Sequence, residues 1–179
     1  MCIFASNDIK VKNMSWEEEK EEFLKKYPLC PTAEDIEVFN LLLLRKNAEE
    51  ILKGDKSVEF RVYSPMHCER LYDKNVLNFL KRHEDNKEVQ QALEKGFIEP
   101  LRMVNSIHFH NYTNSWYLDV ECKANDTMAL IPRDVKFIQD NFNCHELDEA
   151  LADLETRKEK NRPCYFWFAL GDVLGTNLE

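Results

Sequence analysis

The chain has 179 residues, of which 44% are hydrophobic and 32% are charged. This length suits a single domain, and this composition suits a folded globule rather than a disordered segment. The formal net charge of −9 disfavours general binding to nucleic-acid duplexes, because that binding depends on Lys and Arg contacts to phosphates. With only four glycines, a glycine-rich phosphate-binding loop is nearly excluded.

The cysteines and the apolar runs bear on the compartment. Six cysteines are scattered along the chain, and no two have the CxxC spacing of a zinc knuckle or a redox motif. Residues 1–14 lack the positive segment and the apolar run of a signal peptide. No segment approaches the ~18 consecutive apolar residues of a membrane span. We therefore predict a cytoplasmic protein without membrane contact, cofactor or metal.

The helix signals begin near the N-terminus. Ser15 and Glu18 have the spacing of a capping box, which predicts a helix that Pro28 and Pro31 end. Helical periodicity returns over residues 66–96 and predicts two helices, the second opening at residue 85. A further helix is expected to open at residue 143.

Strand signals fill most of the remaining chain. They fall on residues 39–44, 57–63, 103–110, 116–123, 127–131 and 164–170. Asn125 and Asp126 are turn-forming residues and are expected to connect two of these strands. Between the first two strands, Asn47 and Glu50 have capping-box spacing and Gly54 stands where a helix C-cap would be, which predicts a short helix over residues 48–53. This order predicts an α+β domain whose strands come together as a curved sheet or barrel.

Charged residues cluster at the second strand, where residues 54–61 read GDKSVEFR. Residues two apart on a strand lie on one face, roughly 6.6 Å apart, so Glu59 and Arg61 project from the same side. Lys56 lies at the turn before the strand. The pattern alone leaves two interpretations open: a solvated strand face with a surface ion pair worth ~0–1 kcal/mol, or a polar binding site.

GDKSVEFR resembles the G-x-K-x-x-E-x-R pattern of ASCH domains at all four motif positions. Residues 41–53 resemble that family's first strand and helix, and the helix followed by YFWFAL resembles its ending. The resemblance implies a PUA-like (ASCH) curved β-barrel flanked by helices, with the motif residues in a cleft along one side. Residues 38–179 would form this domain. The tail and helix of residues 1–37, packed on the core, and the helical insertion 66–96 would be additions.

ASCH proteins are proposed to bind RNA or modified nucleosides, and one branch comprises amidohydrolases that remove an acetyl group from the exocyclic amine of cytidine. The catalytic lysine, threonine and later glutamate of that branch align with Lys56, Glu59 and Asp140 of this chain. Two of the three positions therefore differ in residue type. The resemblance carries the fold over better than the reaction.

The positive residues near the motif are the candidates for ligand binding. Arg61 can pair with Glu59 or hold a phosphate or carbonyl oxygen bidentately. Arg45 and Lys46 end the first strand beside the capped helix, where they either add positive charge to the cleft or form a solvated strand end. We predict that the protein binds a nucleoside, a nucleotide or single-stranded RNA in this cleft, and in its catalytic version hydrolyses an amide of a modified cytidine. A non-catalytic RNA-binding or protein-interaction module is the alternative. Duplex DNA is not an expected partner.

Two further patterns have competing explanations. His108 and His110 form H-x-H on a predicted strand, an arrangement seen in metal sites that a nearby glutamate completes, but no glutamate follows before Glu121. We interpret these histidines as surface or partly buried residues. Tyr112 and Trp116 lie at a predicted hairpin, where aromatic residues either pack or stack on bases.

Overall fold

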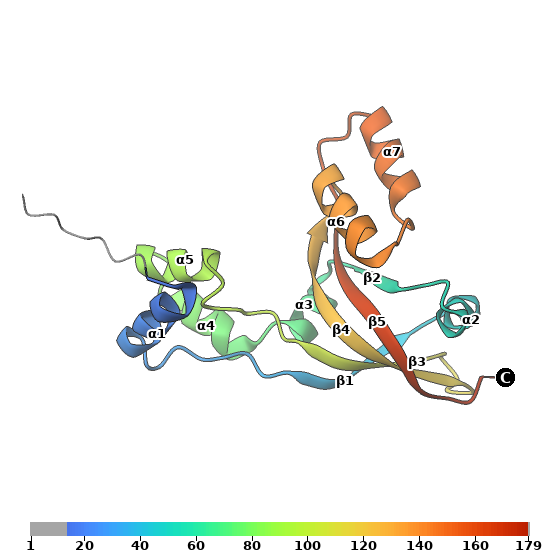
Figure 1. The fold of residues 1–179 in the computed structure, drawn as a ribbon, viewed down its shortest axis with the longest axis horizontal. Coiled ribbons are helices and arrows are strands. Elements are labelled where there is room, and N and C mark those ends of the chain that lie inside the picture. Colours follow the sequence, from blue (N-terminus) through green and yellow to red (C-terminus); the bar gives the residue numbers. More distant parts are fainter. Residues whose placement is uncertain (1–13, 179) are drawn as a thin grey trace, which may run out of the picture.

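The structure of the protein is a computed structural model that describes residues 14–178. In chain order, its elements are α1 (Trp16–Lys26), β1 (Ile36–Leu42), α2 (Arg45–Lys53), β2 (Val58–Val62), α3 (Pro65–Leu71), α4 (Lys74–Arg82), α5 (Lys87–Glu94), β3 (Val104–His110), β4 (Tyr117–Ala129), α6 (Pro132–Phe142), α7 (Asp148–Thr156) and β5 (Cys164–Thr176) (Figure 1). Among the helices of these residues, none has the length and apolar character needed to cross a membrane.

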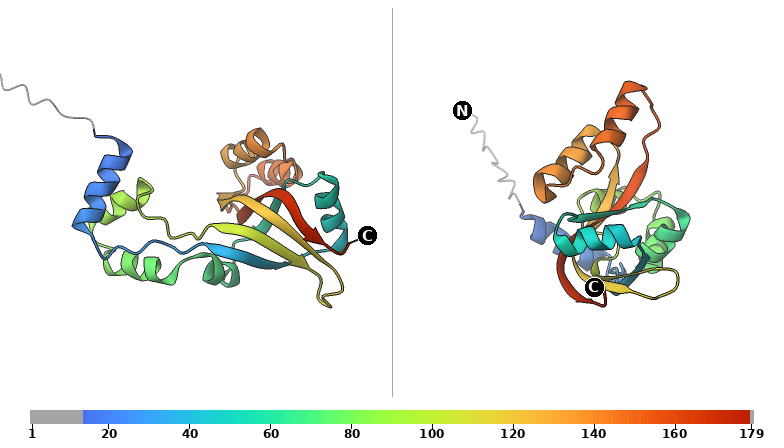
Figure 2. Two further views of the ribbon diagram at one scale, coloured as in Figure 1. Left: turned by 60° about the horizontal axis from the view of Figure 1, so that its bottom comes forward. Right: turned by 90° about the vertical axis from the view of Figure 1, so that its right-hand side faces the viewer.

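The strands form one curved sheet with the order β1-β3-β4-β5-β2 (Figure 2). β1 runs parallel to β3, and the other neighbouring pairs are antiparallel. The register of β4 against β5 shifts three times between Asp119 and Ala124, and such bulges bend a strand pair. β1 and β2 remain as the two edges of the sheet. The predicted α+β class is confirmed, but the strand pairing does not close the sheet into the predicted barrel.

Side chains span the gap between the two edge strands. Arg61, on β2, donates a hydrogen bond from Nη2 to the backbone carbonyl of Leu42 at the end of β1, over 2.7 Å. Arg70, on α3, donates from its own Nη2 to the carbonyl of Asn40 over 2.8 Å, and its guanidinium lies 4.2 Å from the centre of the Phe39 ring. One guanidinium therefore ties β2 to β1, and a second ties α3 to β1, whereas no ladder of backbone hydrogen bonds joins the two edge strands.

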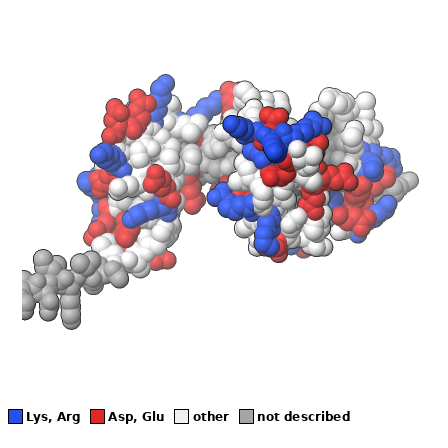
Figure 3. Space-filling model, turned by 90° about the horizontal axis from the view of Figure 1, so that it is seen from above, with Lys and Arg blue, Asp and Glu red and all other residues white. Residues whose placement is uncertain are grey.

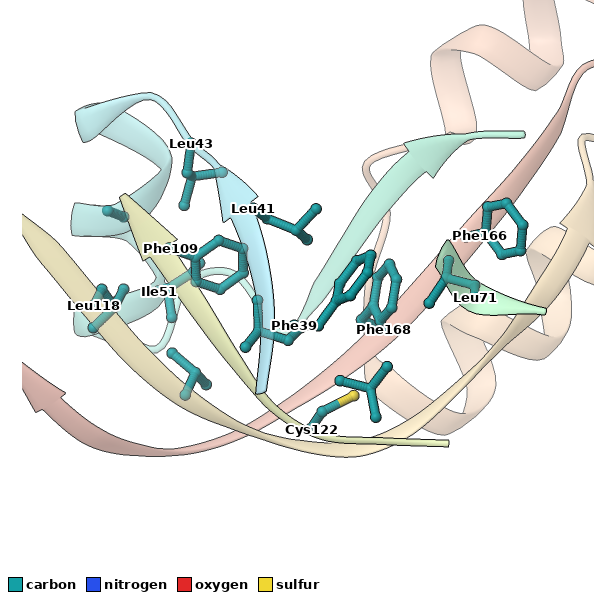
Figure 4. Packing of buried hydrophobic residues seen from close by; sticks show 14 of the residues in the cluster. Phe39, Leu41, Leu43, Ile51, Leu71, Phe109, Leu118, Cys122, Phe166 and Phe168 are labelled. Atoms are coloured by element: carbon teal, nitrogen blue, oxygen red, sulfur yellow. The ribbon is translucent and has the colours of Figure 1, made fainter. Parts of the chain in front are cut away.

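The main hydrophobic core fills the inside of the curved sheet (Figure 4). Phe39 from β1 and Phe168 from β5 stack at its centre, with ring centroids 5.7 Å apart. Ile51 of α2 and Leu71 of α3 close the two ends of this core. Because β1 and β5 are not neighbours in the sheet, their contact shows how far the sheet curls.

A second hydrophobic cluster lies on the outer face of β2, β4 and β5, under α6 and α7. It contains Val58, Met128 and Trp167 from the strands, with Val135 and Ile138 from α6. β2 is thus covered on both faces, since its Val58 joins this outer cluster while its neighbouring residues turn inward. This double burial brings the charged residues of β2 into the interior.

A third cluster forms a helical lobe from α1, α4 and α5, at the end of the molecule away from α2 (Figure 1). Phe23 of α1 packs there with Phe79 of α4, Val89 of α5 and Phe97. The N-terminal helix was expected to pack on the barrel core; the structure instead packs it on the helices of the 66–96 insertion. Its capping box is present, with Ser15 and the Glu18 side chain bonded reciprocally.

Several element boundaries differ from the prediction. The first insertion helix is divided into α3 and α4, and the second opens after Asn86. β4 continues through Asn125-Asp126, which were expected to turn, and β5 continues through Gly171. No helix was predicted at the position of α6. Asn143, which was expected to open the next helix, is instead the C-cap of α6. Asn143 adopts φ 49°, a left-handed conformation typical of a helix C-terminus.

Asn125 explains why β4 does not turn there. Its side chain is buried, its Oδ1 accepts from the backbone N–H of Val104 over 2.8 Å, and its Nδ2 donates to the carbonyl of Arg102 over 3.0 Å.

We expect Asn125→Ala to lower the free energy of unfolding by about 2 kcal/mol, because it leaves a buried N–H without an acceptor. Urea denaturation measures this loss. The exposed Asn105 on β3 provides the control, and Asn105→Ala should change stability by less than about 0.5 kcal/mol. Equal effects of the two substitutions would contradict the assignment.

Candidate functional site

The local fold brings Lys56, Glu59 and Arg61 to one place. α2 ends at Gly54, whose φ of 79° reverses the chain and leads Lys56 back toward the start of β2. Glu59 and Arg61 then alternate with the outward Val58, so both point to the inside of the sheet. Glu59 is 5% exposed. The prediction grouped Glu59 and Arg61 by this alternation and Lys56 by its place at the turn before the strand.

A chain of charged groups connects β2 to its surroundings. Arg61 Nη2 lies 2.9 Å from Glu59 Oε1 and also bonds the carbonyl of Leu42. Lys56 Nζ lies 3.5 Å from Glu59 Oε2 and donates a hydrogen bond to Glu146, in the loop between α6 and α7. Two cations and two carboxylates therefore alternate from the edge of β1 to the α6–α7 loop.

Burial and the neighbouring charges act in opposite directions on the pKa values of Glu59 and Lys56. Desolvation raises the pKa of Glu59 above its ordinary value, outweighing the lowering effects of Arg61 and Lys56. Burial alone would lower the pKa of Lys56, but the hydrogen bond to Glu146 and the charge of Glu59 outweigh it, so that pKa is raised. The two carboxylates thus favour the ammonium form of Lys56, which opposes a role as general base.

Two buried atoms of this group lack a hydrogen-bond partner within the described residues: Glu59 Oε2 and Arg61 Nε. A buried polar atom without a partner costs about 1–3 kcal/mol, and more when the group is charged. Lys56 lies near Glu59 Oε2 without making a hydrogen bond of good geometry. The site therefore has an acceptor that a ligand N–H or O–H can satisfy.

Glu59 and Arg61 line an open cleft with a volume of about 530 Å³. The cleft lies where the end of β1, the start of α2, β2 and the β3–β4 hairpin meet, and its complete lining is Leu42, Leu43, Leu44, Arg45, Asn47, Glu59, Arg61, Asn111, Tyr112 and Trp116. The lining combines charged residues with apolar and aromatic ones. A second hollow of about 430 Å³ adjoins it through Asn47, and Lys56 and Glu146 open onto this second hollow.

The N-terminus of α2 adds positive character to the cleft. α2 begins at Arg45 and not at residue 48, so the predicted capping box of Asn47 and Glu50 does not form its N-terminus. Leu44 occupies the N-cap position, where its side chain accepts no hydrogen bond, and the first turn contains no acidic residue. The free N–H groups and the helix dipole favour an anion at this end.

The structure places the other predicted residues as follows. Arg45 lines the cleft and pairs with Glu49, whereas Lys46 is 84% exposed at its side chain and lies outside the cleft.

Asp140 pairs with Lys136 on the exposed face of α6. The carboxylate beside Lys56 is that of Glu146, not that of Asp140, because α6 ends at Phe142 and the loop after it turns toward Lys56.

The aromatic residues of the hairpin divide between the two predicted roles. Trp116 is buried in the main core, where it packs. Tyr112 is 89% exposed at the mouth of the cleft, where its ring is free to contact a ligand. Sequence reasoning missed Asn111 and Leu44 as lining residues, although Asn111 stands next to the predicted aromatic cluster.

In the part of the chain that the structure describes, no three His, Cys, Asp or Glu side chains gather as a metal site.

Comparisons with known proteins give one structural likeness. No protein-family model matches the chain, and no curated protein matches it. Among solved structures, the chain is similar to the crystal structure of a ZmASCH mutant protein from Zymomonas mobilis, with 12% sequence identity and a TM-score of 0.39. The similarity covers 78% of this chain and 70% of that chain.

Proposed function

We propose that the protein binds a nucleoside or nucleotide in the cleft lined by Glu59 and Arg61. The observation that carries this proposal is the buried carboxylate of Glu59, a residue that lines an open cleft and whose Oε2 makes no hydrogen bond within the described residues. The exocyclic amine of cytosine, adenine or guanine supplies such a donor. A hydrogen bond to a charged group contributes about 1.5–3 kcal/mol, so this contact would select bases by their donors.

The rest of the cleft suits the other parts of a nucleotide. The exposed ring of Tyr112 and the apolar wall of Leu43 and Leu44 offer stacking and packing surface to a base. Arg45 and the free N-terminus of α2 offer charge and N–H donors to a phosphate. A cleft of about 530 Å³ also falls within the usual size of a small-molecule site.

The charge distribution favours a small ligand over a long RNA. Phosphate contacts along an RNA need unpaired cations, but Arg45 pairs with Glu49, Lys46 with Glu50, and Lys56 with two carboxylates. On the face shown in Figure 3, Lys and Arg are interspersed with Asp and Glu rather than gathered in a stripe. One bound nucleotide needs fewer cations than a polyanion.

A catalytic version of the proposal assigns hydrolysis of an N-acetyl group on cytidine to the junction of this cleft with the adjoining hollow, where Lys56 and Glu146 lie. The observation that favours it is the contact of Lys56 with two carboxylates in different surroundings, one buried and one half-exposed. Glu146 would accept a proton from the attacking water, and the Lys56 ammonium would stabilise the oxyanion. Glu146, having taken up that proton, would deliver it to the leaving amine.

Binding is tested by calorimetric titration of cytidine, adenosine, guanosine and uridine into the protein. We expect nucleosides with an exocyclic amine to bind more tightly than uridine, and Glu59→Gln to weaken them by about 10- to 100-fold. Asp140→Asn is the matched control, because this carboxylate lies on the exposed face of α6. Absence of nucleoside binding, or equal affinities for Glu59→Gln and the wild type, would refute the proposal.

Turnover is measured separately, by following deacetylation of N4-acetylcytidine. The catalytic version predicts hydrolysis that Lys56→Ala and Glu146→Gln each reduce by at least about 100-fold. Nucleoside binding without hydrolysis would retain the binding function and reject the catalytic version.

A further inference from the structure

A second set of side chains lies on the outer face of the β3–β4 hairpin, away from the core. His108 and His110 alternate along β3 with the buried Ile107 and Phe109, so both imidazole rings project from the same face. The centroids of the two rings are 5.5 Å apart, and their planes differ by 29°. Tyr117, on β4, stacks on His108 with a centroid distance of 5.8 Å. The H-x-H pattern of the sequence is therefore a spatial pair of rings.

Each ring of this pair is oriented by an oxygen atom at its Nδ1. His108 Nδ1 lies 2.6 Å from Asp119 Oδ1, and His110 Nδ1 lies 3.0 Å from the backbone carbonyl of Asn111. A carbonyl oxygen accepts hydrogen bonds only, and an ionised carboxylate does the same, so Nδ1 is the donor in both rings. When the rings are neutral, each Nε2 then carries the free lone pair.

This is the arrangement that metal-binding histidines have. Such histidines almost always donate their other ring N–H to a carboxylate or a backbone carbonyl, which fixes the tautomer and increases the basicity of the ligand nitrogen. Both partners are present here, one of each kind. Across residues 14–178, neither Nε2 has a hydrogen-bond partner that would compete with a metal.

The separation of the rings also fits a shared ion. With a metal–nitrogen distance of about 2.0–2.1 Å, two imidazole ring centres bound to one tetrahedral ion lie about 5.2 Å apart. The observed centroid distance of 5.5 Å is close to this value. We propose that His108 and His110 bind one divalent transition-metal ion through their Nε2 atoms, a site independent of the nucleotide cleft.

The chemistry of the pair indicates which ions it takes. Imidazole nitrogen suits Cu²⁺, Ni²⁺ and Zn²⁺ rather than Mg²⁺ or Ca²⁺, and the affinity order among the first group places Cu²⁺ highest. The net charge of the chain, −9, adds a general attraction for cations. Two protein ligands leave the remaining coordination positions to water. Asp119 acts as a positioning residue that holds the ring of His108.

Calorimetric titration with Cu²⁺, Ni²⁺ and Zn²⁺ tests the site. We expect one ion per chain in the order Cu²⁺ above Ni²⁺ and Zn²⁺, and a loss of at least about tenfold in affinity for His108→Asn and for His110→Asn. Electron paramagnetic resonance of the Cu²⁺ complex should show two coordinated nitrogens in the wild type and one in each single variant. His145→Asn is the control, because His145 lies in the α6–α7 loop, pairs with Asp148 and should not affect binding.

The role of Asp119 has its own readout. Asp119→Asn should weaken binding by about 10- to 100-fold, and ¹⁵N shifts of the His108 ring should show loss of the Nδ1–H tautomer in the absence of metal. An unchanged tautomer would reject the positioning role. Equal metal binding by the wild type and the His108→Asn/His110→Asn double variant would overturn the site itself. Both rings are partly exposed on the outer face of the hairpin, so their substitution should leave the fold intact. Thermal unfolding without metal checks that each variant is folded.

Discussion

Replacing Arg61 with methionine is expected to lower the free energy of unfolding by about 3–5 kcal/mol at pH 8. Methionine fills much of the same volume but leaves Glu59 buried without its closest cation, and breaking a buried ion pair costs this much. The substitution also removes the hydrogen bond to Leu42 that ties the two sheet edges. Denaturant unfolding monitored by circular dichroism measures the loss.

The effect of this substitution should depend on pH, with a definite sign. Burial already raises the pKa of Glu59 in the folded protein, and loss of Arg61 raises it further. A group of this kind favours the folded state most below its unfolded pKa, and this stability is lost as the pH rises through the folded pKa. The difference between wild type and Arg61→Met should therefore be smaller at pH 4.5 than at pH 8.

Two further variants isolate the cause. Adding Glu59→Gln to Arg61→Met removes the buried charge, so the double variant should recover part of the lost stability at pH 8. Arg45→Met, which breaks only an exposed pair with Glu49, should change stability by less than about 0.5 kcal/mol. An Arg61→Met effect that is independent of pH, or no larger than that of Arg45→Met, would show that Glu59 is not an ionised partner.

Phe168→Ala is expected to lower the free energy of unfolding by about 3–5 kcal/mol. Phe168 is 0% exposed, stacks on Phe39 and lies on β5 between β4 and β2, so its removal leaves a cavity where the curved sheet packs on itself. Chemical denaturation measures the effect. The exposed Tyr112 supplies the control, since Tyr112→Ala should leave stability within about 0.5 kcal/mol. A Phe168→Ala loss below about 1 kcal/mol would contradict this packing.

Features written into short stretches of sequence could be predicted. The capping box of Ser15 and Glu18 acts over three residues, and the αL cap at Gly54 acts over one turn. The alternation of β2 placed Glu59 and Arg61 on one face, because side chains of a strand point alternately to its two sides. These signals sufficed to bring the charged residues of β2 together.

Features set by distant contacts could not be predicted. Glu146 meets Lys56 across 90 positions of sequence, and its place depends on where α6 ends. No helix was predicted between the strand ending at residue 131 and residue 143, although Pro132 stands at the first position of α6, where proline is favoured. Asn125 was expected in a turn because asparagine favours turns, but tertiary burial gave its side chain two backbone partners. Closure of the sheet depends on how strongly the strands bend, and no short sequence pattern indicates the degree of that bending.

The guanidinium ties along β1 also protect the protein from self-association. An exposed edge strand offers unpaired carbonyls to any passing strand, which is a common start of aggregation. Here Arg70 and Arg61 occupy the outward carbonyls of Asn40 and Leu42. An incoming strand would have to displace two charge-assisted hydrogen bonds before it could pair with β1. This edge strand is therefore less available for pairing, even though the sheet does not close into a barrel.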